Sequence, residues 1–392
     1  MSPNTCQPVK VLSLDGGGIR GLSSLLILEK IMENIKVAEG LSEVPKPCDR
    51  FDLIGGTSTG GIIAIMLGRL GMTVDQCIRT YRELAETAFT PKRSRIFPVS
   101  PSGAFSAKKL EGAIKRAIRE NCMMQSCVEH RQMGKPTTNF CKHEDQRLHE
   151  KSCTKTVVLA ITKANVETLP TLFTTYDDST SFSGSKIWEV ARATSAAITF
   201  FKSIKVGRDE VEFIDAGFGH NNPCEALIEE TKKEYPGREM TILSIGTGLG
   251  DVIEIKDKRI SIIKALASMA TTSKAAALRL QNKYSGIGGY YRFNVENGLK
   301  DITLSDWKQA SKISSHTRNY LAENREVVER FIKVIAKANA PNNPSWRQEL
   351  AGNGTVHELS QENALRLPTM PKCAVLEGYY ERTLWHDHQT NA

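Results

Sequence analysis

Short apolar runs alternate along this chain with longer segments whose apolar residues recur every three or four positions. The short runs predict buried strands, and the longer segments predict helices. Because strands and helices alternate, the pattern predicts an α/β protein with one mainly parallel sheet covered by helices on both faces. The predicted strands are Val9–Leu14, Phe51–Ile54, Val157–Thr162, Thr171–Thr175, Val211–Ile214 and Met240–Ile245. The predicted helices are Leu22–Ile35, Gly61–Leu70, Val74–Ala88, Lys108–Arg119, Lys186–Ala197, Glu225–Glu234, Ile260–Lys283 and Arg318–Ala338.

Two glycine-rich turns and one acidic residue come directly after predicted strands. The first turn runs from Asp15 to Gly21, the second from Gly56 to Gly60, and Asp215 follows Val211–Ile214. In a parallel sheet the carboxyl ends of the strands meet at one edge, where ligands usually bind. The sequence therefore predicts that Asp15, Ser58 and Asp215 lie on the same edge.

The second turn has the Gly-x-Ser-x-Gly pattern of a nucleophile elbow, a sharp strand-to-helix turn that exposes a serine hydroxyl. Ser58 is the candidate nucleophile, and the amide of Thr59 is a candidate donor to an oxyanion. The first turn offers further clustered backbone amides to a developing negative charge. Together the two turns predict acyl transfer through a serine ester.

The first turn also fits the dinucleotide-binding pattern G-x-G-x-x-G at Gly16, Gly18 and Gly21. That pattern requires a second strand that ends in an acidic residue about twenty positions further on. Residues 30–37 instead continue a helical pattern, and the next predicted strand leads into Gly55 and Gly56. The dinucleotide interpretation therefore fails in its second half.

The two turns and the Asp215 to Gly217 triplet, in that order, resemble the patatin-like phospholipase family. The stretches Ala193–Phe201 and Gly219–Pro223 are similar to that family as well. The resemblance runs from about residue 9 to about residue 295. It implies a catalytic domain at 9–295. Within this domain, the polar stretch at about 121–154, rich in Cys and His, interrupts the alternation of strands and helices and predicts an insertion. A helical extension and irregular tail are expected at 296–392.

The resemblance implies a three-layer α/β/α fold and hydrolysis of lipid acyl esters by a Ser–Asp dyad without a cofactor or metal. Ser58 would be the nucleophile and Asp215 its base. The implied oxyanion donors are Gly16, Gly17 and Gly18, together with Thr59, and the supporting residues are Arg20, Gly56, Gly60 and Gly217. Arg20 would brace the first turn or favour the anionic intermediate.

Two positions depart from the family pattern, and one histidine offers a different mechanism. Ala216 stands where glycine is commoner, and Ile198 stands where a proline usually precedes Thr-Phe-Phe. Ser58, Asp215 and His220 also occur in the Ser…Asp…His order of α/β-hydrolases. The short interval between Asp215 and His220 leaves little room for a triad, so the dyad is preferred and His220 is expected to be structural.

The predicted insertion holds Cys122, Cys127, His130, Cys141, His143, His149 and Cys153. Cysteine and histidine are the preferred ligands of zinc, but these spacings match no familiar zinc finger. The preferred interpretation is a polar loop with unpaired thiols. No metal is therefore predicted.

The chain has 392 residues, with 52 Lys and Arg, 44 Asp and Glu, and a net charge of +8. This modest excess is compatible with a solvated surface or with attraction to anionic phospholipid. The segment Lys92–Arg95, between Phe89 and Phe97, is the candidate for such membrane contact. A polar N-terminus, no run of eighteen apolar residues and nine cysteines predict a cytoplasmic protein with transient contact to membranes.

The expected activity is a serine acyl hydrolase that cleaves phospholipids or lysophospholipids, without a nucleic-acid partner. The alternatives are acyl transfer to a lipid or alcohol on the same dyad, and a lipid-binding or regulatory module without catalysis. The intact Ser58 and Asp215 argue against the module. The oligomeric state is not indicated by the sequence.

Overall fold

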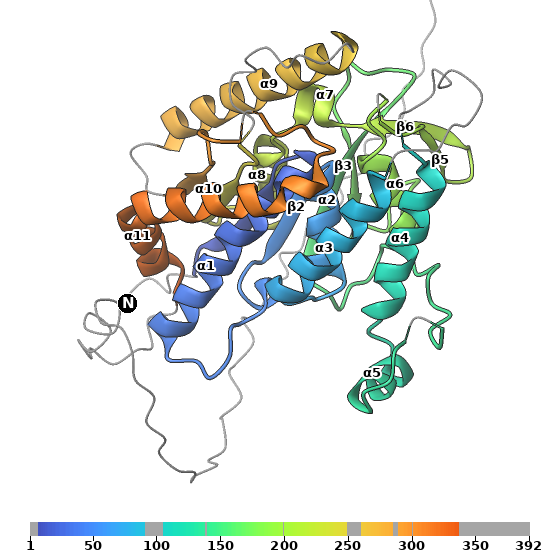
Figure 1. Ribbon diagram of the computed structural model, residues 1–392, viewed down its shortest axis with the longest axis horizontal. Helices are drawn as coiled ribbons and strands as arrows, with labels where there is room; N and C mark the ends of the chain where they lie inside the picture. Colours follow the sequence, from blue (N-terminus) through green and yellow to red (C-terminus); the bar gives the residue numbers. More distant parts are fainter. Residues whose placement is uncertain are drawn as a thin grey trace, which may run out of the picture. The chain divides into compact units, whose positions relative to one another are not determined.

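The computed structural model describes residues 7–90, 105–137, 139–198, 200–248, 260–284, 289–299 and 301–336, with side chains from residue 271 onward in the helix 260–284 (Figure 1). The predicted basic segment Lys92–Arg95 with Phe97, and the tail from residue 340, lie outside these residues. Within the described part of the chain, no helix is both long and apolar enough to span a bilayer.

Eight strands of the described residues form one sheet, in the order β5-β6-β3-β2-β1-β7-β8, with β4 also paired to β3. The strands are β1 Val9–Leu14, β2 Leu53–Thr57, β3 Lys155–Thr162, β4 Thr171–Thr174, β5 Ile204–Val206, β6 Val211–Asp215, β7 Met240–Ile245 and β8 Tyr290–Phe293. The pairs β3–β2, β2–β1, β1–β7 and β7–β8 are parallel, whereas β4 and β6 run antiparallel to β3. The sheet is therefore mainly parallel, as predicted.

Helices cover both faces of this sheet. The longer helices are α1 Gly21–Glu39, α3 Val74–Ala88, α4 Ala107–Glu120, α8 Cys224–Glu234, α9 Ile260–Tyr284, α10 Ala310–Glu323 and α11 Arg325–Ile335. The shorter ones are α2 Thr59–Ala64 with its π-helical continuation Ile65–Arg69, α5 Gln125–Gln132, α6 Ile187–Thr194 and α7 Gly217–His220. Single 3-10 turns occur at Gly18–Arg20, Pro47–Asp49 and Trp307–Gln309.

Alternate residues of each strand belong to two separate cores, because successive side chains point to opposite faces. In β1, Leu12 and Leu14 join the larger core beneath α1, α2, α3, α4 and α6, and Val9 and Val11 join the smaller core. The smaller core contains Leu227 of α8 with apolar residues of the sheet. Helix α10 packs on α1, and α3 packs against both α1 and α4 (Figure 1). The predicted three-layer α/β/α architecture is confirmed.

Most predicted elements are present, with informative differences. Strands β1 and β7 have the predicted bounds, but β2 extends to Thr57 because its glycines pair with β1 and β3 on both sides. The predicted helix Arg318–Ala338 is instead two helices that meet at Asn324. The Asn324 side chain donates to the carbonyl of Tyr320 and so ends α10. The short strands β5 and β8 were not predicted, and neither was α5 within the insertion.

The direction of β6 corrects the argument that placed Asp215 on the edge of the sheet. In a wholly parallel sheet, Asp215 would lie at the carboxyl ends of the strands because it follows a strand, but β6 is antiparallel to β3. Asp215 pairs with Ala160, one residue beyond the Leu159 that pairs with Thr57. Strand β6 therefore approaches from outside this edge and ends level with Ser58.

Candidate active site

The nucleophile elbow lies between β2 and α2. Ser58 has φ of 57° and ψ of −128°, in a region that costs a non-glycine residue about 1–3 kcal/mol. A Cβ at Gly56 would lie 2.2 Å from the oxygen of Gly60, and one at Gly60 would lie 2.3 Å from the oxygen of Leu14. The turn can close this tightly only because both of these positions are glycine.

The Ser58 hydroxyl donates a hydrogen bond directly to Asp215, with Oγ and Oδ2 separated by 2.6 Å. The other carboxylate oxygen, Oδ1, accepts from the amide of Gly217 at 2.8 Å. The Ser58 amide donates to Oγ1 of Thr194 in α6 at 2.8 Å. Both ends of the contact are therefore held by neighbouring elements.

Burial controls the acidity of Asp215, which is only 1% exposed. Loss of solvent raises the pKa of this carboxyl to about 7, although the bonds from Ser58 and Gly217 oppose the rise. A carboxylate with a pKa near 7 is a far better proton acceptor than one at the ordinary value of 3.8. The environment therefore turns a weak base into one that suits neutral pH.

His220 contacts this site through its backbone atoms. Its carbonyl accepts from the Thr57 hydroxyl at 2.8 Å, and its amide donates to Ala216 at 2.9 Å. Burial lowers the pKa of the half-buried imidazole. Since Ser58 and Asp215 are in direct contact, no space remains between them for an imidazole ring.

The glycine turn packs beside the elbow, but its amides differ in availability. The Gly16 amide donates to the carbonyl of Asn221 at 3.1 Å, and the Gly17 amide donates to the Thr59 hydroxyl at 3.1 Å. The amides of Gly18 and Thr59 have no acceptor among the described residues. Among the predicted oxyanion donors, the amides of Gly18 and Thr59 are therefore unengaged, whereas the Gly16 amide is already engaged.

Two arginines support the glycine turn, and only one was predicted. Arg20 is buried and donates to the carbonyls of Gly248 and Leu299, each at 3.3 Å. It therefore braces the loop. Arg292 of β8 forms a two-pronged ion pair with buried Asp15, with contacts of 2.8 and 2.5 Å. No local pattern pointed to Arg292, because its partner lies 277 residues away in the sequence.

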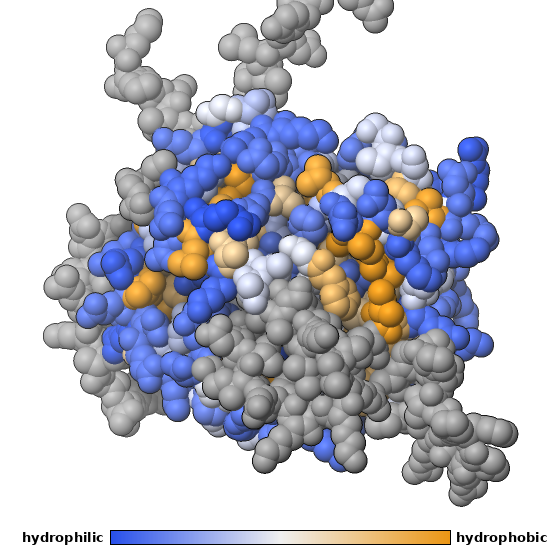
Figure 2. Space-filling view, turned by 90° about the horizontal axis from the view of Figure 1, so that it is seen from above, coloured by the Kyte–Doolittle hydropathy of each residue, from blue (hydrophilic) through white to orange (hydrophobic). Residues whose placement is uncertain are grey.

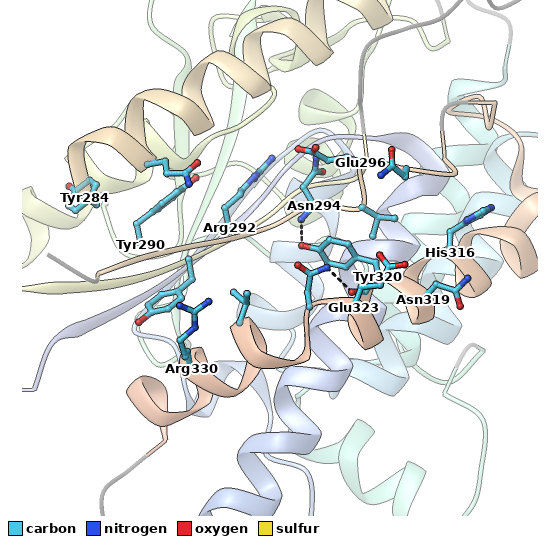
Figure 3. Close-up of a pocket in the computed structure, with 16 residues that line it drawn as sticks. Tyr284, Tyr290, Arg292, Asn294, Glu296, His316, Asn319, Tyr320, Glu323 and Arg330 are labelled. Carbon is cyan, nitrogen blue, oxygen red and sulfur yellow. Dashed lines mark hydrogen bonds between the residues drawn. The ribbon is translucent and has the colours of Figure 1, made fainter. Parts of the chain in front are cut away.

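Two further features of the structure, a cavity and an aromatic cluster, do not form an acyl-binding pocket at the dyad. A cavity of about 900 Å³ lies along β8, α9 and α10, and polar and aromatic side chains such as Tyr320 and Asn294 line it (Figure 3). Arg292 lines this cavity, but neither Ser58 nor Asp215 does. Phe200 and Phe201 are buried in an aromatic cluster with Phe89 and Phe105, with ring centroids 5.4–6.5 Å apart.

Comparison with known proteins adds independent support to the fold. The family model for patatin-like phospholipases matches residues 12–228, more than half of the chain and a span that includes Ser58 and Asp215. The chain belongs to the patatin-like phospholipase family. Within this patatin-like chain, the predicted insertion at 121–154 lies inside the matched span, and Arg292 lies beyond it.

Relatives of this patatin-like chain include animal and bacterial proteins. Calcium-independent phospholipase A2-gamma of Rattus norvegicus is 26% identical over 350 residues, which are 84% of this chain and 40% of that protein. The cGAMP-activated phospholipase of Vibrio cholerae is 25% identical over 376 residues, 84% of this chain and 94% of that protein. This chain thus spans about two fifths of the rat relative's length. The superposition on the solved structure of human GIVD cytosolic phospholipase A2 covers 83% of this chain and 60% of that chain. The sequence identity is 12% and the TM-score is 0.39, so this likeness is slight.

Proposed function

We propose that this protein is a serine acyl hydrolase that cleaves fatty-acyl esters of phospholipids or lysophospholipids. The observation that carries the proposal is the 2.6 Å hydrogen bond from the strained Ser58 to Asp215, a carboxyl whose burial raises its pKa to about 7. A nucleophile in contact with a matched base is the arrangement that covalent catalysis requires. Membership of the patatin-like family and relatives named phospholipases support a lipid ester as substrate.

In this mechanism Ser58 Oγ attacks the ester carbonyl carbon while its proton passes to Asp215 Oδ2. The tetrahedral oxyanion is stabilised by the amides of Gly18 and Thr59, with Gly17 available once the Thr59 hydroxyl turns away. Asp215 then gives the proton to the leaving alcohol, and the acyl-enzyme forms. A water molecule then attacks the acyl group while one of its protons passes to Asp215. As the bond to Ser58 breaks and the fatty acid leaves, Asp215 returns that proton to Ser58 Oγ.

Ser58→Ala and Asp215→Asn test this assignment in the full chain, with wild type and His220→Ala alongside. Covalent labelling by a fluorophosphonate and mass spectrometry of phospholipid products are the two measurements. We expect no labelling of Ser58→Ala and losses of hydrolysis of about 10³-fold or more for both dyad variants. Folded wild-type protein that is not labelled at Ser58 would disprove the hydrolase and favour a non-catalytic lipid-binding role. Transfer to an added alcohol or lysolipid would show as a new ester among the products.

The proposed activity requires contact with a lipid surface, because a phospholipid must leave its bilayer to reach the buried Ser58. Figure 2 shows apolar residues at the surface of one face, among hydrophilic ones. Ile198 is 53% exposed and lies two residues after Ala196, whose carbonyl accepts from the Asp215 amide at 3.2 Å. We propose that Ile198 meets the lipid surface beside the site.

Ile198→Asp tests this contact, with Val37→Asp as the matched control. Val37 is 49% exposed and lies on α1 about 24 Å of helix away from the glycine turn. Hydrolysis of anionic vesicles should fall in Ile198→Asp but not in Val37→Asp, and hydrolysis of a monomeric short-chain ester should stay the same in both. Equal vesicle activity in the two variants would refute the contact.

A further inference from the structure

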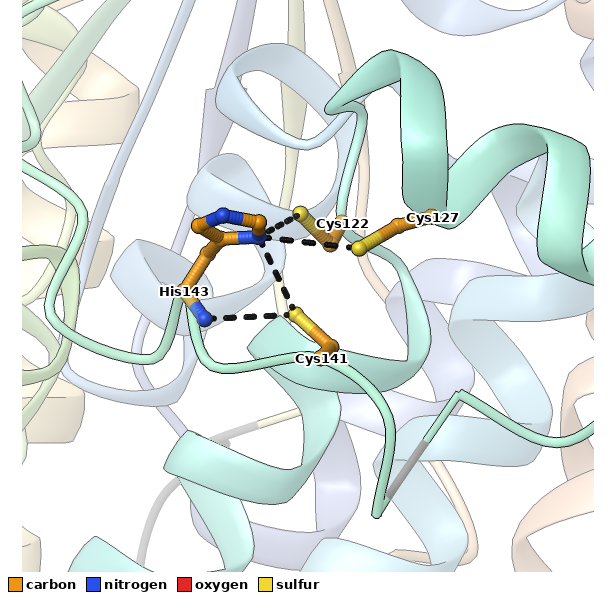
Figure 4. A group of neighbouring side chains, drawn as sticks. All are labelled: Cys122, Cys127, Cys141 and His143. Atoms are coloured by element: carbon orange, nitrogen blue, oxygen red, sulfur yellow. Dashed lines mark hydrogen bonds between the residues drawn. The ribbon is translucent and has the colours of Figure 1, made fainter.

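Four side chains of the insertion converge on one point. The group is Cys122 after α4, Cys127 in α5, and Cys141 and His143 in the loop that follows (Figure 4). Their three Sγ atoms and one imidazole nitrogen all lie within 4.8 Å of one another. Of the other candidates in the insertion, His130 stacks on Phe140 instead, with ring centroids 4.0 Å apart.

The convergence of three sulfurs on one nitrogen does not suit ordinary hydrogen bonds. The three sulfurs lie 3.5, 3.5 and 3.6 Å from the same nitrogen, Nδ1 of His143. A ring nitrogen has one lone pair or one proton, so it cannot bond to three thiols at once. A tetrahedral Zn²⁺ with Zn–S of about 2.3 Å and Zn–N of about 2.0–2.1 Å separates sulfur from nitrogen by about 3.6 Å. The three observed sulfur–nitrogen distances are therefore those expected around a central zinc ion.

The burial of the group also requires an explanation. Cys122, Cys127 and Cys141 are at most 2% exposed, and together they form a small core separate from the two cores of the sheet. Helix α5 buries no side chain other than Cys127. Apolar packing of α5 is thus sparse, and bound metal is the usual substitute for a core in small, polar folds.

Two N–H groups donate to the sulfurs, as they commonly do around metal thiolates. The Gln146 side chain donates to Cys122 Sγ at 3.2 Å, and the His143 amide donates to Cys141 Sγ at 3.4 Å. We propose that Cys122, Cys127, Cys141 and His143 bind one Zn²⁺ in a closed, tetrahedral structural site. Binding releases the three thiol protons to solvent, and four protein ligands leave no open position for substrate.

The proposed zinc site is joined to elements that hold the dyad. Arg69, at the end of the helix that begins after Ser58, donates to the carbonyls of Leu148 and Arg147 at 2.8 and 3.0 Å. Trp188 of α6 donates to Asp145 at 2.8 Å, and α6 also carries the Thr194 that accepts from the Ser58 amide. The zinc would therefore fix the insertion against the two helices nearest the nucleophile.

Metal analysis of the purified full chain tests the proposal. Protein that is incubated with ZnCl₂ and then gel-filtered should hold about one equivalent of zinc by mass spectrometry. Cys127→Ser and His143→Gln should hold less than a fifth of that amount. The matched controls Cys153→Ser and His130→Gln, from the same segment, should keep it. Cys153 is half-buried, and its thiol donates to the Glu150 carbonyl outside the group.

Cobalt substitution tests the proposed metal site on wild-type protein, even if the ligand variants fail to fold. We expect intense tetrahedral d–d bands and sulfur-to-cobalt charge transfer, both abolished by stoichiometric zinc. Wild-type protein with neither zinc nor this spectrum would overturn the proposal. Full zinc content in Cys127→Ser and His143→Gln, or a disulfide among the three cysteines in protein purified under reducing conditions, would overturn it as well.

Discussion

The substitution Asp215→Asn separates two effects of the buried carboxylate, namely its destabilisation of the fold and its action as a base. The carboxylate is enclosed, and its two oxygens accept from Ser58 and from the Gly217 amide. An asparagine has nearly the same shape and keeps an oxygen for Gly217, while its Nδ2 donates to the Ser58 hydroxyl. We therefore expect Asp215→Asn to stabilise the fold while it removes the base.

The magnitude follows from the pKa. A raised folded pKa means that the folded state holds its proton more tightly than the unfolded chain does. The associated stability is present below about pH 3.8 and is lost as the pH rises through about 7. The full loss is about 4 kcal/mol, of which about 2–3 kcal/mol falls between pH 5 and pH 8. The advantage of Asp215→Asn over wild type should therefore grow by about that amount across this interval.

Urea unfolding at pH 5 and pH 8, followed by circular dichroism, measures this difference. Asp209→Asn is the matched control, because its side chain is 70% exposed. Its unfolding free energy should differ from that of wild type by the same small amount at both pH values. If the difference between Asp215→Asn and wild type does not change with pH, the carboxyl is not held near pKa 7 by burial, and the reasoning is wrong.

Four further predictions concern the same site. First, kcat/KM for a soluble ester should rise with pH and level off above about 7, since Asp215 must be ionised to act as base; a flat profile from pH 5 to 8 would contradict this. Second, His220→Ala should keep activity within about tenfold of wild type, and a loss as large as that of Asp215→Asn would indicate a triad. Third, Gly60→Ala should abolish fluorophosphonate labelling, because its Cβ would lie 2.3 Å from the backbone oxygen of Leu14, at the end of β1. Fourth, Arg292→Met should lower the unfolding free energy by about 3–5 kcal/mol, as it leaves Asp15 buried without its partner; thermal melts that match wild type would refute this.

Interpretation of the sequence was most successful where the decisive contacts are local. The bounds of β1 and β7 were predicted from their apolar runs alone. The elbow was also recognisable, because Gly56, Ser58 and Gly60 are neighbours in the chain and their close approach is built into one turn. Such features need no information about the rest of the protein.

The sequence was least informative about which residues of the predicted insertion come together. Four residues separate Cys122 from Cys127, a spacing within the usual range for zinc ligands, and that was the available signal. His130, His149 and Cys153 obscured it, since the sequence cannot say which of seven candidates share one point. The structure groups four of them through a loop that returns from Cys127 to Cys141.

By itself, the sequence predicted most of the elements, the serine turn flanked by glycines, and the candidate nucleophile with its candidate base. Tertiary structure alone decided that β6 runs antiparallel and yet ends beside Ser58, that Arg292 reaches Asp15, and that the Gly16 amide is already engaged. The physical reason is separation along the chain: Ser58 and Asp215 lie 157 residues apart. Contacts at such a distance depend on how the whole sheet is ordered, and so does the burial that raises the pKa of Asp215.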